Sequence, residues 1–140
     1  MIHNAINQML QSTNWGELDY LIVDLPPGTS DSPLTVMQTL TMDGFVVVTT
    51  PQELAKIDAK RSINMIKKLQ VNVLGIVENM SGGIFGSGAG TEIANELNLD
   101  FLGSIQLRQD YQDTSKPASL LNNEILNEYE SIIQKSLVNL

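Results

Sequence analysis

The sequence of 140 residues contains no cysteine, one histidine, and only eight lysine and arginine residues against sixteen aspartate and glutamate residues. The lack of cysteine excludes disulfides, thiolate-bound metals and a thiol nucleophile within these residues. A net charge of -8 without any basic cluster argues against a surface that binds nucleic acid or an anionic membrane. His3 has no aspartate or serine partner in view, so we expect neither a histidine triad nor a histidine metal site.

Long apolar runs and a secretory signal are also lacking. No stretch approaches the roughly 20 apolar residues that span a bilayer. The first residues have neither the basic start nor the apolar core of a signal peptide. A hydrophobic content of 42% with 17% charged residues is typical of a globular domain. We therefore expect a cytoplasmic protein with no membrane or nucleic-acid partner, of one domain's length and with a real core.

Short apolar runs alternate along the chain with segments of helical spacing. Four runs read as strands buried on both faces: Leu21–Val23, Phe45–Val48, Val71–Val77 and Phe101–Ile105. Four segments read as helices: residues 32–40, 52–69, 91–97 and 122–138. Alternating strands and helices predict parallel pairing through right-handed crossovers. The expected fold class is therefore α/β, a doubly wound, mainly parallel sheet with flanking helices.

Two of these helices have apolar residues spaced so that several share a stripe. In the helix over residues 52–69 they are Leu54, Ile57, Ala59, Ile63, Ile66 and Leu69. In the helix over residues 122–138 they are Ile125, Leu126, Tyr129, Ile132, Ile133 and Leu137. We expect the helix over residues 91–97 to end at Asn98.

Polar residues follow the predicted strands at the points where the strands end. Asp24 follows the first strand, Thr49-Thr50-Pro51 follows the second, and Glu78-Asn79-Met80 follows the third. In open α/β sheets, ligands bind at the carboxyl ends of the strands. We therefore expect these three segments to share one rim of the sheet and to form a site.

The run Leu18–Asp31, with the sequence LDYLIVDLPPGTSD, ends a buried-type strand on a carboxylate and breaks into a glycine turn. A carboxylate such as Asp24 can hold Mg²⁺, usually through water, because Mg²⁺ favours hard oxygen ligands and keeps much of its hydration. In the turn Pro26-Pro27-Gly28, the glycine lets a backbone N–H approach a terminal phosphate closely. Asp24 taken by itself is explained as a residue that caps the turn. The whole run from Leu18 to Asp31 favours a site for a metal and a phosphate.

The other candidates are open between a functional and a structural role. Asp31 can order a water or contact a partner subunit, or it can serve with Ser32 only as a helix cap. Thr50 has a hydroxyl that can face a phosphate, although the segment 49–52 is by itself explained by the start of a helix. Asn79 has a donor and an acceptor that suit the edge of an adenine ring, or it forms a turn.

The glycine-rich segment over residues 81–90 resembles a P-loop only in composition. Gly83 and Gly88 have the spacing of G-x-x-x-x-G-K-[ST], but Ala89-Gly90 stands where lysine and serine or threonine are required. Without that lysine there is no point charge for phosphates. We interpret this segment as a mobile surface loop.

Five motifs occur in a consistent order: Leu18–Asp31, Val46–Gln52 with Asp58–Arg61, Val73–Ser81, Ile84–Gly88 and Phe101–Ile105. Together they resemble the Mrp/ApbC-type ATPases, iron-sulfur cluster carriers in the MinD/ParA branch of P-loop proteins. The resemblance covers about Trp15 to Pro117. It implies an Mg-ATP site sandwiched in a homodimer, with iron-sulfur client proteins. It also implies that residues 1–140 are the C-terminal portion of a single P-loop NTPase domain, its Walker B, switch II and adenine-side half.

The resemblance implies roles for single residues. Asp24 lies on the metal side, Gly28 lies in the switch loop near the γ-phosphate, and Asn79 matches the family's adenine-contacting asparagine. Gln106 lies in the segment that flanks the base, where the family commonly has proline. The candidate catalytic residues are Asp24, Gly28 and Asp31, with Asp24 also the candidate metal ligand. The candidate nucleotide-binding residues are Pro27, Thr50, Asn79 and Gln106.

Two departures from the family pattern matter for function. The family's Walker A loop, rich in glycine and with two lysines, lies upstream of the matching region and is absent from these residues. Many members carry Cys-x-x-Cys where this chain has Gly82-Gly83, so cluster ligation by this chain is unsupported. We predict that the isolated chain does not hydrolyse ATP measurably.

Two alternatives stay open. A MinD/ParA-like positioning ATPase would need a basic tail or basic patches, but the last helix has three glutamates against Lys135. The other alternative is a non-enzymatic half-domain that assembles with a separate P-loop subunit. A doubly wound sheet without its first strand exposes an unpaired edge and apolar surface, so we expect the isolated chain to be weakly stable or to associate.

Overall fold

The computed structural model of the protein describes residues 2–25 and 31–140, which form two compact units divided after Met42. The first unit contains, among its described residues, α1 (Ile2–Ser12) and α2 (Asp31–Thr39), which pack against each other. The hydroxyl of Thr39 donates a hydrogen bond to Asn7 Oδ1 at 2.8 Å. The helix predicted over residues 32–40 is thereby confirmed, although it begins at Asp31.

The strand predicted at Leu21–Val23 is wrong, because residues 20–25 have no regular secondary structure. Two of its apolar side chains are exposed to solvent, Ile22 by 91% and Leu21 by 46%. A strand is held by backbone hydrogen bonds to a neighbouring strand, and an isolated one is not stable in water. The segment has a strand-forming sequence but pairs with no strand among the described residues.

The second unit, from Asp43 to Leu140, is built on a parallel sheet with the strand order β1-β2-β3. The strands are β1 (Phe45–Thr49), β2 (Val73–Ser81) and β3 (Phe101–Gln106). Each lies where the apolar pattern predicted it, but β2 starts at Val73 rather than Val71 and continues to Ser81 rather than Val77.

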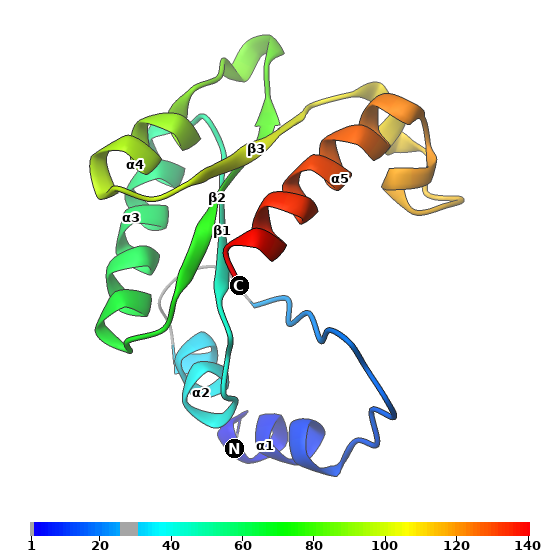
Figure 1. Ribbon diagram of the computed structural model, residues 1–140. Coiled ribbons are helices and arrows are strands. Elements are labelled where there is room, and N and C mark those ends of the chain that lie inside the picture. Colours follow the sequence, from blue (N-terminus) through cyan, green and yellow to red (C-terminus); the bar gives the residue numbers. More distant parts are fainter. Residues whose placement is uncertain (1, 26–30) are drawn as a thin grey trace. The chain divides into compact units, whose positions relative to one another are not determined.

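Helices cover both faces of this sheet (Figure 1). α3 (Glu53–Lys68) and α4 (Ala89–Leu97) lie on one side of it, and α5 (Asn123–Val138) lies on the other, against β3 and β2. Short 3-10 turns over residues 83–85, 109–112 and 118–120 complete this unit. The α/β fold class with a parallel sheet and flanking helices is confirmed.

The core lies between the sheet and its helices. Its fully buried side chains come from every layer: Ile63, Ile76, Ile93, Leu102 and Ile125. The ends of the helices follow local chemistry, since Asn122 Oδ1 accepts the Ile125 N–H at the start of α5. Asn98 ends α4 in the left-handed conformation, as predicted.

The predicted apolar stripes of α3 and α5 are wider than the faces that these helices bury. The buried stripe residues are Ala59, Ile63, Ile66, Ile125 and Ile132. In contrast, Leu54 is 77% exposed and Ile57 46% exposed in α3, and Ile133 and Leu137 are about half exposed in α5. Spacing assigns a residue to one side of a helix, but the extent of the surface packed against that side decides burial.

β1 is an edge strand that is covered on one face only. Phe45 and Val47 are buried, whereas Val46 is 41% exposed and Val48 is 58% exposed. α3 packs on β1, whereas α5 packs mainly on β3 and on the 3-10 turn over residues 118–120. The prediction that this strand is buried on both faces is therefore wrong, and an apolar face of β1 is left open.

Candidate functional site

The parallel strands bring their carboxyl ends to one edge of the sheet. Thr49 at the end of β1 pairs with Glu78 of β2, and the last residue of β2 pairs with Gln106 of β3. Thr50, Asn79 and Gln106 therefore lie along the same edge. This is the edge at which open α/β sheets bind ligands. The predicted rim is found for these strand ends, and the binding role of the three residues stays a prediction.

The other candidates belong to the first unit. Asp24 is exposed and lies in the irregular segment that follows α1. Pro27 and Gly28 lie outside the described residues. Asp31 is the first residue of α2, and its side chain also lies outside the described part. The roles predicted for these four residues stay predictions.

A bulge interrupts β2 close to Asn79. Glu78 pairs with Ser104 and Ser81 pairs with Gln106, so β2 has one residue more than β3 between these two pairs. The backbone of Met80 has a φ of 55°, in the left-handed region that residues with a side chain rarely adopt. Bulges commonly re-aim a side chain next to a binding site.

Glu78 is a charged side chain of which only 1% is exposed. Its carboxylate accepts hydrogen bonds from Ser81 Oγ at 2.8 Å, from Gly88 N at 3.1 Å and from Gly90 N at 2.8 Å. Both amides belong to the start of α4, where free N–H groups and the helix dipole favour an anion. An internal carboxylate therefore occupies the place that a phosphate would take at this helix.

The glycine-rich segment before α4 is consequently no phosphate cradle. Its sequence lacks the required lysine, and its last amides already donate to Glu78. Residues 83–88 are exposed, which confirms the predicted surface location for this part of the loop. Ser81, Ala89 and Gly90 are instead buried and belong to β2 and α4. The mobility of the loop stays a prediction.

An ion pair supports the end of β3. Arg108 Nη1 donates to both carboxylate oxygens of Glu128 in α5, at 2.8 and 2.9 Å, and Gln106 N donates to the same carboxylate at 3.4 Å. The side chains of Arg108 and Glu128 are only 14% and 18% exposed. The hydrogen bond to Glu128 raises the pKa of Arg108 above its ordinary value. The pair therefore fixes the backbone of Gln106 against α5.

Tyr111, in the 3-10 turn over residues 109–112, has a buried hydroxyl without a hydrogen-bond partner among the described residues. Burial raises the pKa of this phenol, and Tyr129 and Glu128 raise it further. Buried polar atoms are usually hydrogen-bonded. Tyr111 thus keeps an unused donor close to the Arg108–Glu128 pair.

Sequence reasoning did not assign roles to Glu78, Arg108, Glu128 or Tyr111. A signal existed for Glu78, because a carboxylate directly after a buried apolar run needs partners that satisfy its charge. No local signal existed for Arg108, because its partner lies 20 residues away in the sequence.

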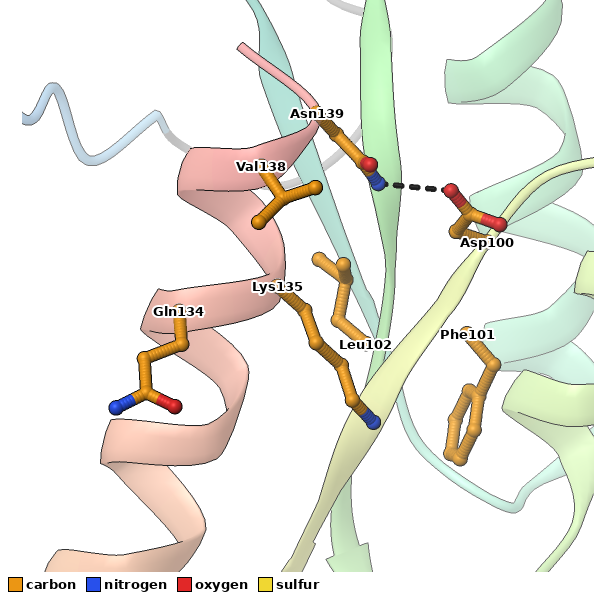
Figure 2. A pocket seen from close by; sticks show the side chains of 7 residues that line it. All are labelled: Asp100, Phe101, Leu102, Gln134, Lys135, Val138 and Asn139. Carbon is orange, nitrogen blue, oxygen red and sulfur yellow. Dashed lines mark hydrogen bonds between the residues drawn. The ribbon is translucent and has the colours of Figure 1, made fainter.

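A cavity of about 360 Å³ lies at the other end of β3 (Figure 2). It is lined by Asp100, Phe101, Leu102, Gln134, Lys135, Val138 and Asn139. Asn139 Nδ2 donates to Asp100 Oδ2 at 2.8 Å across it. Because β3 begins at Phe101, this cavity adjoins the amino end of the strand and lies away from the carboxyl edge of the sheet.

The residues fit part of an Mg-ATP site. Among the side chains that the structure describes, which do not include those of His3 and Asp31, no three histidine, aspartate or glutamate residues are grouped closely enough to hold a metal ion. Mg²⁺ is usually held by one or two carboxylates with substrate phosphates, so Asp24 fits as a single ligand. The phosphate side does not fit, because no lysine-bearing glycine loop occurs in the sequence.

None of the helices in the described part is long and apolar enough to cross a membrane.

A family model described as NUBPL iron-transfer P-loop NTPase, of the ParA group, matches residues 1–138. Similar proteins include iron-sulfur cluster carrier proteins from Methanocaldococcus jannaschii, Synechocystis and Escherichia coli, which are 41%, 48% and 47% identical. These alignments cover 96%, 76% and 79% of this chain, but 51%, 33% and 34% of the relatives. The chain therefore spans between about a third and about half of their length.

A solved structure is similar as well. It is a nucleotide-binding protein from Archaeoglobus fulgidus in complex with ADP, with a TM-score of 0.70 and 38% sequence identity. The match covers 91% of this chain and 54% of that one.

Proposed function

This chain belongs to the NUBPL-type iron-transfer P-loop NTPases of the ParA group, and we propose that it supplies the metal side and the base side of an ATP site in an iron-sulfur cluster carrier or assembly protein. The observation that supports this most is the shared carboxyl edge of the sheet, which carries Thr50, Asn79 and Gln106. The similar protein from Archaeoglobus fulgidus was solved with ADP, and a nucleotide is therefore the natural ligand to test.

On the base side, Asn79 contacts the adenine ring, Gln106 flanks it, and Thr50 faces the phosphates. Asn79 and Gln106 are suited to this because they are held by the bulge in β2 and by the Arg108–Glu128 pair, respectively. A ligand that meets preorganised groups loses less free energy on ordering them.

On the metal side, Asp24 holds Mg²⁺ together with the phosphates, and Pro27 and Gly28 lie in the turn beside the γ-phosphate. Asp31 orders a water or contacts a second subunit, since the proposal includes a homodimer. Bound Mg-ATP would supply the γ-phosphoryl group, whose transfer to water with ADP as the leaving group would drive a conformational or dimer-exchange step.

The isolated chain is expected to show no ATP hydrolysis. Phosphate binding in this class needs backbone amides and a lysine, and the amides at the start of α4 already donate to Glu78. Phosphate release is measured for the purified chain with Mg-ATP and for an Asp24→Asn variant. Turnover by the unmodified chain that disappears in the variant would contradict the proposal.

Base recognition is tested by titrating adenosine while recording nitrogen-proton correlation NMR spectra. The largest shifts are expected at Thr50, Asn79 and Gln106. Asn79→Ala should weaken binding about five- to tenfold, the value of about one hydrogen bond. Asn95→Ala, on the exposed face of α4, is the matched control and should bind as the original chain does. Shifts confined to the cavity at Asp100 and Val138 would contradict the proposal.

An iron-sulfur cluster is cargo in this proposal, passed on to client proteins. The chain has no cysteine, so the thiolate ligands of such a cluster have to come from other residues or molecules. Anaerobic reconstitution of the purified chain with iron and sulfide is expected to leave no stoichiometric cluster absorbance. A stable cluster on this chain would overturn that part of the proposal.

A second candidate function is that of a half-domain that assembles with a separate P-loop subunit. β1 supports this because, among the described strands, it pairs with β2 alone, and unpaired edge strands readily take up another strand. Val46 and Val48 are also exposed on one face of β1. Mixing the chain with an N-terminal fragment of a relative that carries the P-loop is expected to restore ATP hydrolysis. A mixture without activity and without complex formation in gel filtration would argue against it.

A further inference from the structure

The bulge in β2 sets the orientation of the Asn79 carboxamide. Met80 N donates a hydrogen bond to Asn79 Oδ1 at 2.8 Å, which uses one of the two lone pairs of the amide oxygen. The amide nitrogen Nδ2 has no hydrogen-bond partner among the groups that the structure describes. Asn79 therefore offers a donor at the carboxyl edge of the sheet.

The backbone of Met80 makes this arrangement possible. In a regular strand its N–H would take part in the ladder between strands. Here the bulge leaves this N–H free for Asn79, and the left-handed φ of 55° lets the chain rejoin the strand at Ser81. Such a backbone costs free energy in a residue with a side chain, and it persists only where its surroundings hold it.

Buried hydrogen bonds hold the bulge on both sides. Ser81, which is 6% exposed, donates its hydroxyl to Glu78 and accepts the Leu107 N–H on its carbonyl at 3.0 Å. The same Glu78 carboxylate accepts the Gly90 N–H at the start of α4. Relaxing the bulge into regular pairing would break these bonds inside the core, where unsatisfied groups are costly.

We propose that Glu78 and Met80 are positioning residues for base recognition, because they hold the Asn79 carboxamide with its donor toward the ligand. This inference rests on the proposed function of the carboxyl edge. The ligand that fits is a nucleobase with a hydrogen-bond acceptor on the edge that meets Asn79, such as a ring nitrogen of adenine.

Two substitutions of Met80 separate its backbone from its side chain. Both Met80→Asn and Met80→Val remove the thioether at a position that is 43% exposed. Asparagine adopts the left-handed conformation readily, whereas β-branched valine does so rarely. Met80→Asn should keep the adenosine affinity of the original chain within about twofold, and Met80→Val should lose about five- to tenfold, the value of about one hydrogen bond.

The NMR signals of the Asn79 side-chain amide provide a readout that needs no ligand. In the free protein they should change in Met80→Val and stay in place in Met80→Asn. Unchanged Asn79 signals in Met80→Val, or equal losses of affinity in both variants, would overturn the role of the Met80 backbone. If adenosine causes no shift of the Asn79 signals in the original chain, the proposed function is overturned. The signals of the ligand-free protein would still decide whether the Met80 backbone orients the Asn79 carboxamide.

Glu78→Gln tests the other positioning residue. It keeps the size of the side chain but puts an amide donor against groups that need an acceptor, so about a three- to tenfold loss of adenosine affinity is expected. Ile93→Val, at a fully buried position in α4, is the control for lowered stability. This variant should bind adenosine with the affinity of the original chain. Equal affinity of Glu78→Gln and the original chain would show that Glu78 only caps α4 and would overturn its positioning role.

Discussion

The two units of the chain contain similar apolar runs in very different environments. In the second unit, three such runs pair in parallel, and Ile76 in the middle strand is fully buried. In the first unit, the run Leu21–Val23 is irregular, and Ile22 is 91% exposed. All contain β-branched or aromatic residues, which are typical of strands, so β-propensity does not separate them. The runs differ in whether a neighbouring strand forms hydrogen bonds with them and a helix covers them. A strand-forming sequence is not sufficient without these neighbours.

The same contrast holds for the two sides of the proposed site. The base side is held by Glu78, whose carboxylate has three hydrogen bonds in the core of the second unit. The metal side is represented by Asp24, an exposed residue on an irregular segment. We therefore expect the base side to be preorganised in the isolated chain and the metal side to need further structure.

The strongest test of this contrast replaces one isoleucine in each unit. Ile76→Ala should destabilise the chain by about 2–5 kcal/mol, because it removes packed methylene groups and leaves a cavity. Ile22→Ala should change the free energy of unfolding by less than about 0.5 kcal/mol. Urea unfolding followed by circular dichroism measures both. Similar losses at the two positions would mean that Ile22 is packed and that the contrast is wrong.

A smaller effect is expected from the ion pair that supports Gln106. Arg108→Met should cost about 1–3 kcal/mol, because it leaves the mostly buried Glu128 carboxylate without its guanidinium partner. Arg61→Met is the matched control, since its pair with Asp58 has side chains that are 69% and 65% exposed. The control should unfold at the same urea concentration as the original chain. Equal effects of the two changes would show that burial of the first pair is unimportant.

The helix cap of α5 should matter by about 1 kcal/mol. Asn122→Ala removes the acceptor of the Ile125 N–H, a loss typical of N-cap substitutions. Asn127→Ala, at an exposed position inside the same helix, should instead stabilise it slightly, because alanine has the higher helix propensity. Changes of the same sign in thermal unfolding would contradict this account of α5.

The smallest expected effect is the pH dependence of the contact between α3 and α4. Hydrogen bonds to Glu53 and Glu92 raise the pKa of Lys56 to about 12, and the bond to Lys56 lowers the pKa of Glu92. The Lys56 contribution is complete below its ordinary value of 10.5 and is lost as the pH rises through about 12. The Glu92 contribution is complete above 4.5 and is lost as the pH falls through its lowered pKa.

Melting temperatures measured from acid to neutral pH should therefore fall slightly more at acid pH for the original chain than for Lys56→Met. Added salt should reduce this difference, because the pair lies at the surface. A difference between the two chains that is unaffected by salt would point to another cause.

Much of the second unit could be predicted because its signals are local. Alternation of apolar runs and helical spacing predicted β1, β2, β3 and their helices, and strand ends predicted that Thr50 and Asn79 share an edge. The backbone partners of Glu78, Gly88 and Gly90, could not be predicted, because they lie ten and twelve residues further along the chain. The left-handed Met80 could not be predicted either, because glycine is the residue that usually signals this conformation.

The sequence by itself determined the family, the order of the elements in the second unit, and the absence of thiolate ligands within these residues. Only the tertiary structure decided that the run Leu21–Val23 is unpaired, that β1 is covered on one face, and that Glu78 holds the bulge beside Asn79. The reason is physical. Motif and periodicity are properties of the residues along the chain, whereas burial and hydrogen bonding depend on the neighbours that folding places around each residue.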